Sequence, residues 1–123
     1  MKIAITIWED RISPVFDASR RLLIVDIENS RIGERSFLVF DPEQPSGLAK
    51  TLASLGVEVL ICGAVSQLPA TIINAADITL MPFITGQVDR VLEAFARGES
   101  LEPTFLMPGC HGSSSTAGNS APQ

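Results

Sequence analysis

The spacing of apolar residues changes once along this chain, and that change restricts the fold more than any other feature. Up to residue 40 the apolar residues follow strand-like patterns in three segments, which are 2–7, 21–28 and 32–40. From Ser46 onward they recur at helical spacing, beginning with Leu48, Leu52 and Leu55. Strands followed by alternating helices and strands are typical of an α/β domain.

Turn and cap residues divide the chain into elements. Residues 29–31 are turn formers, so the second and third strands are expected to form an antiparallel hairpin with Gly33 near its tip. Ser46 is expected to cap the start of the first helix and Gly56 to close its end. The later elements are expected to be a strand at 57–62, a helix capped by Ser66, a strand at 77–81 and a helix at 86–97.

The order of these elements predicts one α/β domain with a five-stranded mixed sheet flanked by helices. Ligands of such open sheets bind beyond the carboxyl ends of the parallel strands. We expect these ends at residues 8–10, 62–63 and 82–83. The end of the chain is rich in Ser, Gly, Ala and Asn, which predicts a folded domain over 1–111 and a disordered polar tail over 112–123.

Composition and charge exclude several classes of function. The 123 residues include nine Lys and Arg against 14 Asp and Glu, and the basic residues are scattered, so nucleic acid is not an expected partner. No apolar run approaches the ~18 residues of a membrane span and no secretion signal is recognisable, which predicts a cytoplasmic protein without a membrane partner. The common nucleotide-binding and hydrolase motifs are absent, so we expect no enzyme activity.

Two cysteines are the candidate metal ligands. Cys62 closes a buried strand and precedes Gly63, whose missing side chain gives a ligand access to the backbone. The alternative is a buried cysteine that only fills space. Cys110 stands beside His111, and a preassembled cluster needs only one or two protein thiolates together with counter-charges and hydrogen bonds. Adjacent residues do not easily bind one metal together, so a closed zinc site is not expected.

The loop at 11–21 is the second candidate region. It contains a Ser-Pro turn, an aromatic anchor and a carboxylate, which are Ser13, Phe16 and Asp17. Three positive charges lie near the exit of the first strand, and these are Arg11, Arg20 and Arg21. Such a loop can hold an anion. The alternative is that Arg20 and Arg21 are a solvated start of the second strand, paired with Glu9, Asp10 or Asp17. Trp8, at the end of the first strand, either flanks a ligand crevice or packs at its rim.

Several segments together resemble a known family. They are MKIAIT at the start, SPVFD and RRLLIVDIE in the first half, GVEVLICGAVS and MPFITGQVDRVLEAF in the second, and FLMPGC near the end. The sequence is similar to the NifX/NifB-type dinitrogenase iron-molybdenum cofactor biosynthesis family over about residues 1–111. Some members of this family carry a histidine in the loop that corresponds to SPVFD. This chain has none there, so imidazole ligation from that loop is not expected.

The resemblance implies an α/β fold with a ribonuclease H-like motif and a carrier function without catalysis. Family members carry molybdenum- or iron-sulfur clusters, and the related orange proteins hold a molybdenum-copper sulfide cluster; cofactor-assembly proteins are the implied partners. The loop and the family motifs together predict a cluster site formed by Ser13, Phe16, Asp17, Arg20, Cys62, Gly63 and Cys110, with Cys62 and Cys110 as metal ligands.

Two other interpretations stay open at the level of sequence. One is a small interaction or regulatory module in which the cysteines are incidental. The other is a redox or metal-sensing protein that uses the two cysteines as a thiol pair. The second of these requires the Cα atoms of Cys62 and Cys110 to lie within the ~4.4–6.8 Å range of a disulfide. The sequence does not indicate the oligomeric state.

Overall fold

The computed structural model describes residues 1–102 and 104–108, which form one α/β domain. Three α-helices and one 3-10 turn lie within these residues, and they are α1 (Pro45–Leu55), α2 (Gln67–Ala75), α3 (Val88–Ala96) and η1 (Phe16–Ala18). The strands are β1 (Lys2–Trp8), β2 (Arg11–Ile12), β3 (Arg21–Glu28), β4 (Arg31–Val39), β5 (Val57–Ile61) and β6 (Thr79–Met81).

The mixed sheet has the strand order β4-β3-β1-β5-β6, and β2 pairs with β1 beside this path. β1 is antiparallel to β3 and parallel to β5, and β5 is parallel to β6. The sheet therefore has six strands within the described residues, and the expected number of five was wrong. The additional strand, β2, was missed because it has two residues, too few to show any alternation of apolar and polar side chains.

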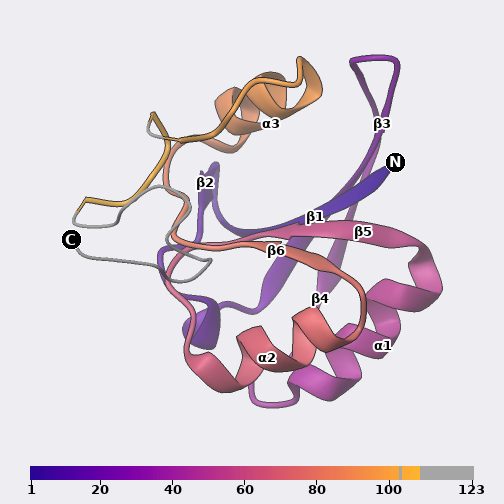
Figure 1. Ribbon diagram of the computed structural model, residues 1–123, viewed down its shortest axis with the longest axis vertical. Helices are drawn as coiled ribbons and strands as arrows, with labels where there is room; N and C mark the ends of the chain where they lie inside the picture. Colours follow the sequence, from indigo (N-terminus) through magenta and orange to yellow (C-terminus); the bar gives the residue numbers. More distant parts are fainter. Residues whose placement is uncertain (103, 109–123) are drawn as a thin grey trace.

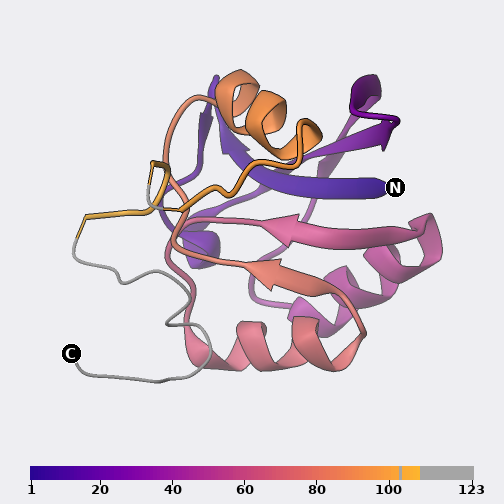
Figure 2. The same ribbon diagram turned by 45° about the horizontal axis from the view of Figure 1, so that its top comes forward.

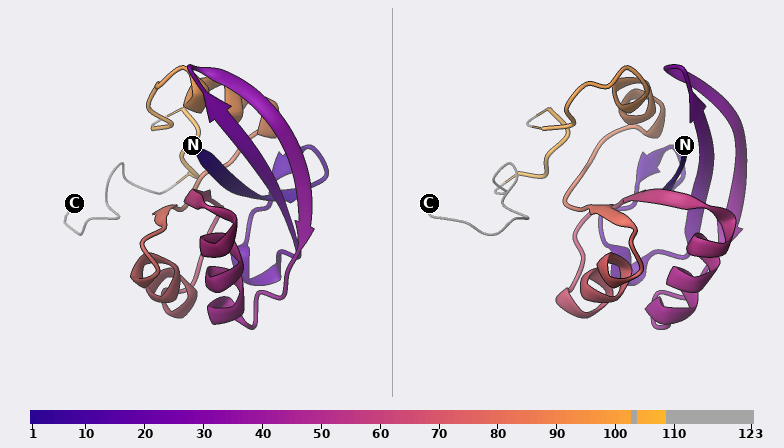
Figure 3. Two further views of the ribbon diagram at one scale, coloured as in Figure 1. Left: turned by 90° about the vertical axis from the view of Figure 1, so that its right-hand side faces the viewer. Right: turned by 45° about the vertical axis from the view of Figure 1, so that its right-hand side comes forward.

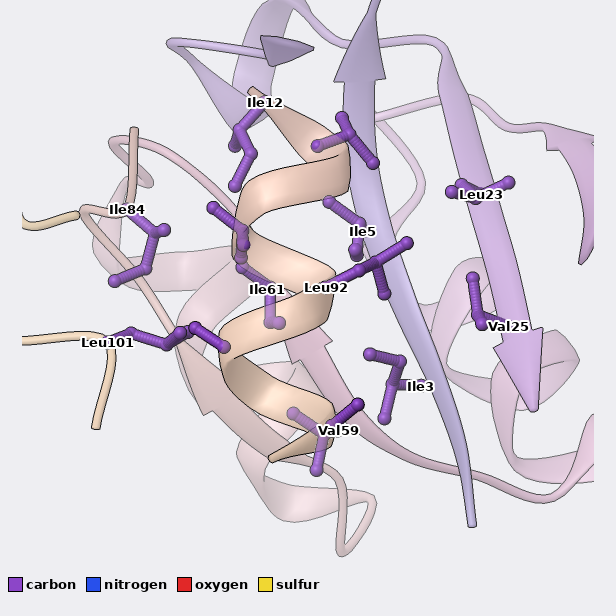
Figure 4. Packing of buried hydrophobic residues seen from close by; sticks show 14 of the residues in the cluster. Ile3, Ile5, Ile12, Leu23, Val25, Val59, Ile61, Ile84, Leu92 and Leu101 are labelled. Carbon is purple, nitrogen blue, oxygen red and sulfur yellow. The ribbon is translucent and has the colours of Figure 1, made fainter. Parts of the chain in front are cut away.

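Helices cover both faces of the sheet (Figures 1 and 2). Helix α3 lies on one face, over a core that includes Ile3, Ile5 and Leu92 (Figure 4). Helices α1 and α2 lie on the other face, where Leu52 and Leu60 are buried. Each strand of the centre is apolar on both sides because both faces are covered, which explains the nearly continuous apolar runs in the sequence.

Several element ends differ from the expectation by one or two residues. Helix α1 begins at Pro45 and its N-cap is Gln44, so Ser46 lies inside the helix and does not cap it. A proline suits the first helical position, where no backbone N–H is needed. Helix α3 begins at Val88 rather than at residue 86. The hairpin turn is formed by Asn29 and Ser30, with φ of 53° and 63°, and Gly33 lies within β4 instead of at the tip.

The topology determines where a ligand site is possible. β1, β5 and β6 are parallel, so their carboxyl ends lie at one edge of the sheet, where the antiparallel β3 begins. The N-terminus lies at the opposite end (Figure 1). Among the helices that the structure describes, none is long and apolar enough to cross a bilayer.

Candidate functional site

The carboxyl ends of β5 and β6 are joined by backbone hydrogen bonds. The N–H of Cys62 donates to the carbonyl of Met81 at 3.1 Å, and the N–H of Ile84 donates to the carbonyl of Cys62 at 3.0 Å. The N–H of Phe83 donates to the carbonyl of Gly63 at 2.9 Å. The two segments that follow these strands therefore form one rigid edge, as the parallel topology predicts.

The loop between β2 and β3 is attached to this edge. The N–H of Ser13 donates to the carbonyl of Thr6 at 2.9 Å, which holds the loop against β1. The N–H of Ala64 donates to the carbonyl of Pro14 at 2.9 Å, and the N–H of Phe16 donates to the carbonyl of Ala64 at 2.7 Å. The structure thus brings together the SPVFD loop and the segment after Cys62, two regions that the sequence only suggested were related.

Gly63 gives the loop the space for this close approach. A Cβ atom at this position would lie 2.5 Å from the carbonyl oxygens of both Ser13 and Pro14. Side chains do not occupy such distances, so no residue other than glycine fits without moving the loop backbone. The space that we assigned to a ligand from the sequence is filled by the loop in this structure.

Phe16 and Asp17 anchor the loop from two directions. The Phe16 side chain has no exposed surface and lies against Phe40, with the ring centroids 5.6 Å apart. The Asp17 carboxylate accepts hydrogen bonds from the backbone N–H of Ser66 at 3.2 Å and from its hydroxyl at 2.5 Å. Asp17 therefore caps the N-terminus of α2 from a distant part of the chain, while the Ser66 hydroxyl makes no capping bond within its own helix.

Cys62 is fully buried beneath this loop. Its side chain has no exposed surface and belongs to the same apolar cluster as Phe16. Burial, with a smaller contribution from the charge of Asp17, raises the pKa of the Cys62 thiol to about 12. At neutral pH the thiol is therefore protonated and out of contact with solvent, so metal binding through Cys62 requires the structure around it to open.

A groove of about 440 Å³ lies on the outer side of the loop. Its lining includes Trp8 and the two arginines that precede and begin β3, Arg20 and Arg21. Trp8 is 65% exposed, and Arg20 is 67% exposed with its Nη1 atom 3.9 Å from the Asp41 carboxylate. The groove thus combines an exposed indole with two guanidinium groups, and Trp8 is part of its lining.

The hydroxyl groups at the base of the groove are bonded within the loop. Ser13 and Ser19 are buried and line the groove, with their Oγ atoms 2.6 Å apart. The Ser19 Oγ atom also lies 2.7 Å from the carbonyl oxygen of Val15. Ser13 therefore shapes the loop. Ser19 was not identified from the sequence, because nothing in its neighbours indicates that its side chain turns inward.

The three arginines of the sequence analysis separate in the structure. Arg20 and Arg21 line the groove, whereas Arg11 does not and lies opposite Trp8 in the β1–β2 pair. The Arg21 guanidinium carbon lies 5.4 Å from the centroid of the Phe37 ring, a cation–π distance. Arg20 and Arg21 are exposed, as the alternative interpretation predicted, but the carboxylate near Arg20 is Asp41 and not one of the expected Glu9, Asp10 or Asp17.

The last described segment returns to the same edge. The N–H of Met107 donates to the carbonyl of Phe83 at 2.8 Å, and Leu106 forms an isolated bridge with Ile84. The MPGC motif thus begins beside β6, but Cys110, His111 and the expected domain end at residue 111 lie outside the described residues. Within residues 1–102 and 104–108, no three His, Cys, Asp or Glu side chains gather as a metal site.

Solved structures with this fold are known. The crystal structure of PH0822 is 22% identical and superposes with a TM-score of 0.71, covering 80% of this chain and 93% of that one. The apo form of the orange protein from Desulfovibrio gigas is 19% identical, with a TM-score of 0.62 and coverage of 80% and 88%. A candidate dinitrogenase from Methanocaldococcus jannaschii is 24% identical, with a TM-score of 0.66 and coverage of 80% and 90%.

At these identities the structural similarity establishes the fold alone. No curated protein matches the sequence. The model of the family described as "Dinitrogenase iron-molybdenum cofactor" matches residues 1–98, which include the SPVFD loop, Cys62 and all three helices. With this match over most of its length, the chain belongs to the dinitrogenase iron-molybdenum cofactor family.

Proposed function

We propose that the protein is a non-enzymatic carrier of a metal-sulfur cluster that contains molybdenum with iron or copper, acting in cofactor assembly or trafficking. The family supports the connection with an iron-molybdenum cofactor. The observation that carries the proposal is the groove formed by Trp8, Arg20 and Arg21 at the edge where ligands of such sheets bind. Cofactor-assembly proteins are the proposed donors and receivers of the cluster.

The chemistry of the groove suits an anionic cluster. Thiomolybdate-type clusters are negative, and the two guanidinium groups offer charge and N–H donors to their sulfides. The protein as a whole has a formal charge of −5, so two arginines at one groove are a local exception. In this proposal the cluster is held by charge and hydrogen bonds, and Cys110, three residues after Met107, supplies a thiolate.

The other expected site residues support the groove in this proposal. Ser13, Phe16, Asp17 and Gly63 hold the loop in place through the contacts described above. Cys62, which the sequence suggested as a ligand, joins the metal only in a state in which the loop has lifted. In this proposal the exposed groups of the groove bind the cluster, and the buried residues hold the loop in position.

The test is to titrate reduced protein with tetrathiomolybdate under anaerobic conditions, alone and with copper(I), and to follow backbone NMR shifts. We expect shifts at residues 13–21 and at the Trp8 indole. Arg20→Gln and Arg21→Gln should each weaken binding about 5-fold, since removing one partly exposed charge costs about 1 kcal/mol. Arg31→Gln, at the opposite end of the same hairpin, should leave binding unchanged. Unshifted loop signals, or equal affinity in all three variants, would contradict the proposal.

A cysteine series separates the carrier from a protein-interaction module. Cys110→Ser should weaken thiomolybdate binding more than Cys62→Ser, because Cys62 is covered in the apo-protein. The interaction module, in which the cysteines are incidental, predicts instead that partner proteins are retained by the double variant and that no cluster is bound by any variant. A stable disulfide between the two cysteines, detected by non-reducing mass spectrometry, would favour the thiol-pair interpretation.

A further inference from the structure

β4 is an open edge of the sheet. It is nine residues long and pairs with β3 on one side only. The right-hand view of Figure 3 shows it at the outside of the sheet. The other edge strand, β6, has only three residues. A long edge strand presents free N–H and C=O groups to which another strand can add.

The two halves of β4 differ in how they are protected. The half nearer the turn carries Arg31 and Glu34, and the register with β3 shifts between Ile32 and Arg35. Charges and irregular register are the usual means by which an edge strand avoids association. The half that ends the strand is regular and exposes two large apolar side chains, since Phe37 is 62% exposed and Val39 is 76% exposed.

Three arginines near the regular half of β4 already have partners. The Arg35 Nη1 atom lies 2.9 Å from the Asp89 carboxylate, and Arg20 lies 3.9 Å from Asp41. The Arg21 guanidinium lies over the Phe37 ring. Because Arg35, the cation of the regular half of β4, is already paired with Asp89, an acidic partner gains little there, whereas an apolar, self-complementary partner would cover Phe37 and Val39.

Antiparallel pairing of β4 with itself has one register that uses the whole regular stretch Arg35–Val39. Centred on Phe37, it places the two Phe37 rings side by side, Arg35 opposite Val39, and Ser36 opposite Leu38. No two like charges then face each other. Centred on Arg35 instead, the register would oppose two guanidinium groups, and centred on Ser36 it would draw the irregular residues 33 and 34 into the ladder.

We propose that two copies of the protein associate through antiparallel β4–β4 pairing centred on Phe37, which continues the sheet from one copy into the other. In the dimer each Phe37 ring lies between its own Arg21 and the partner's Phe37. Five residue pairs form a small interface, so the dimer is weak. The dimer contact and the cluster groove share Arg21, which stacks on Phe37 and also lines the groove, whereas Trp8 and Arg20 take no part in the dimer.

Sedimentation velocity of the full chain between about 10 µM and 2 mM tests the association. We expect the wild type to shift toward dimer as its concentration rises. Phe37→Glu places two carboxylates opposite each other and should raise the dissociation constant more than about 10-fold. Leu68→Glu changes an equally exposed leucine on α2, 67% exposed, and should dimerise as the wild type does. A monomer throughout, or equal behaviour of the two variants, would overturn the proposal.

Cross-linking tests the register in a Cys110→Ser background, where the remaining Cys62 is buried. Phe37→Cys places two thiols across the two-fold axis and should oxidise to a disulfide dimer. In Val39→Cys the two thiols are offset by four residues, about 13 Å along the strands, which is beyond disulfide range. We expect cross-linking at least 10-fold faster for Phe37→Cys. Equal rates would exclude this register and thereby the proposal.

Discussion

At the scale of single residues, Gly63 shows how a position can matter through the side chain that it lacks. The loop carbonyls of Ser13 and Pro14 occupy the place where a Cβ atom would be. Cys62, directly before it, is covered by the same loop and stays protonated at neutral pH because burial raises its pKa. Both residues looked like ligand contacts in the sequence, and both are held under a loop in the structure.

Gly63→Ala should destabilise the protein by roughly 2–3 kcal/mol, because the new methyl group overlaps two backbone oxygens that cannot rotate away. Gly47→Ala is the matched control. Gly47 lies in α1 with nothing within 4 Å of the added Cβ, so this change should stabilise by about 0.5–1 kcal/mol through the better helix propensity of alanine. Urea unfolding of both variants provides the comparison, and a Gly63→Ala protein as stable as wild type would refute the close approach.

At the scale of elements, the contact between Asp17 and Ser66 joins η1 to the start of α2. The first turn of α2 contains no acidic residue of its own, so Asp17 is the negative group at this helix N-terminus. The same loop lines the groove. The bond between Asp17 and Ser66 therefore links the position of this loop to the start of α2.

Asp17→Ala should lower the free energy of unfolding by about 1 kcal/mol, the usual cost of removing a helix cap. Ser66→Ala should cost a similar amount, and the double variant should cost less than the sum of the two, because the residues share one interaction. Glu43→Ala removes an exposed carboxylate that forms no side-chain hydrogen bond in the described structure and should change little. Strict additivity of the two changes in thermal or urea unfolding would show that the contact is absent in solution.

At the scale of the whole molecule, the features that suggest binding lie at two places on the sheet. One is the edge where β1, β5 and β6 end, with its groove and its covered thiol. The other is the free half of β4, with Phe37 and Val39. The rest of the described molecule is a core covered on both sheet faces, and its global stability depends on the side chains buried there. Among the described residues of that core, Cys62 is the ionisable one.

The pKa of Cys62 predicts that stability falls in alkaline solution. Unfolding restores the ordinary pKa of 9.0, so above pH 9 the unfolded state loses a proton that the folded state keeps until about pH 12. Stability from this thiol is thus complete below pH 9 and decreases by up to about 1.4 kcal/mol per pH unit between pH 9 and 12. The chain has no tyrosine, which leaves few other groups titrating in this range.

The measurement is urea unfolding at pH 8.5 and 10.5 in a Cys110→Ser background, with and without Cys62→Ala. Cys62→Ala should be less stable at pH 8.5 because a small cavity replaces the sulfur, but it should lose about 2 kcal/mol less than its parent on going to pH 10.5. Parallel losses in the two proteins would mean that the Cys62 thiol is accessible to solvent in the folded state.

The sequence by itself determined the class of fold, the order of the main elements and the edge at which a site can form. These follow from local spacing, since the apolar period of each segment fixes its type and the parallel crossovers fix which ends meet. It did not determine β2, which is too short to have a period, or the bond between Asp17 and Ser66, which are 49 positions apart.

Only the tertiary structure decided which of the candidate residues face outward. The side chains of Phe16 and Cys62 are buried in the core and Gly63 lies against the loop backbone, while Trp8, Arg20 and Arg21 line the groove. The physical reason is that exposure at a loop depends on which backbone packs over which strand end, and that packing is set by hydrogen bonds between segments far apart in the chain. Residue type alone suggests which groups have ligand chemistry, whereas the fold determines which of them are exposed.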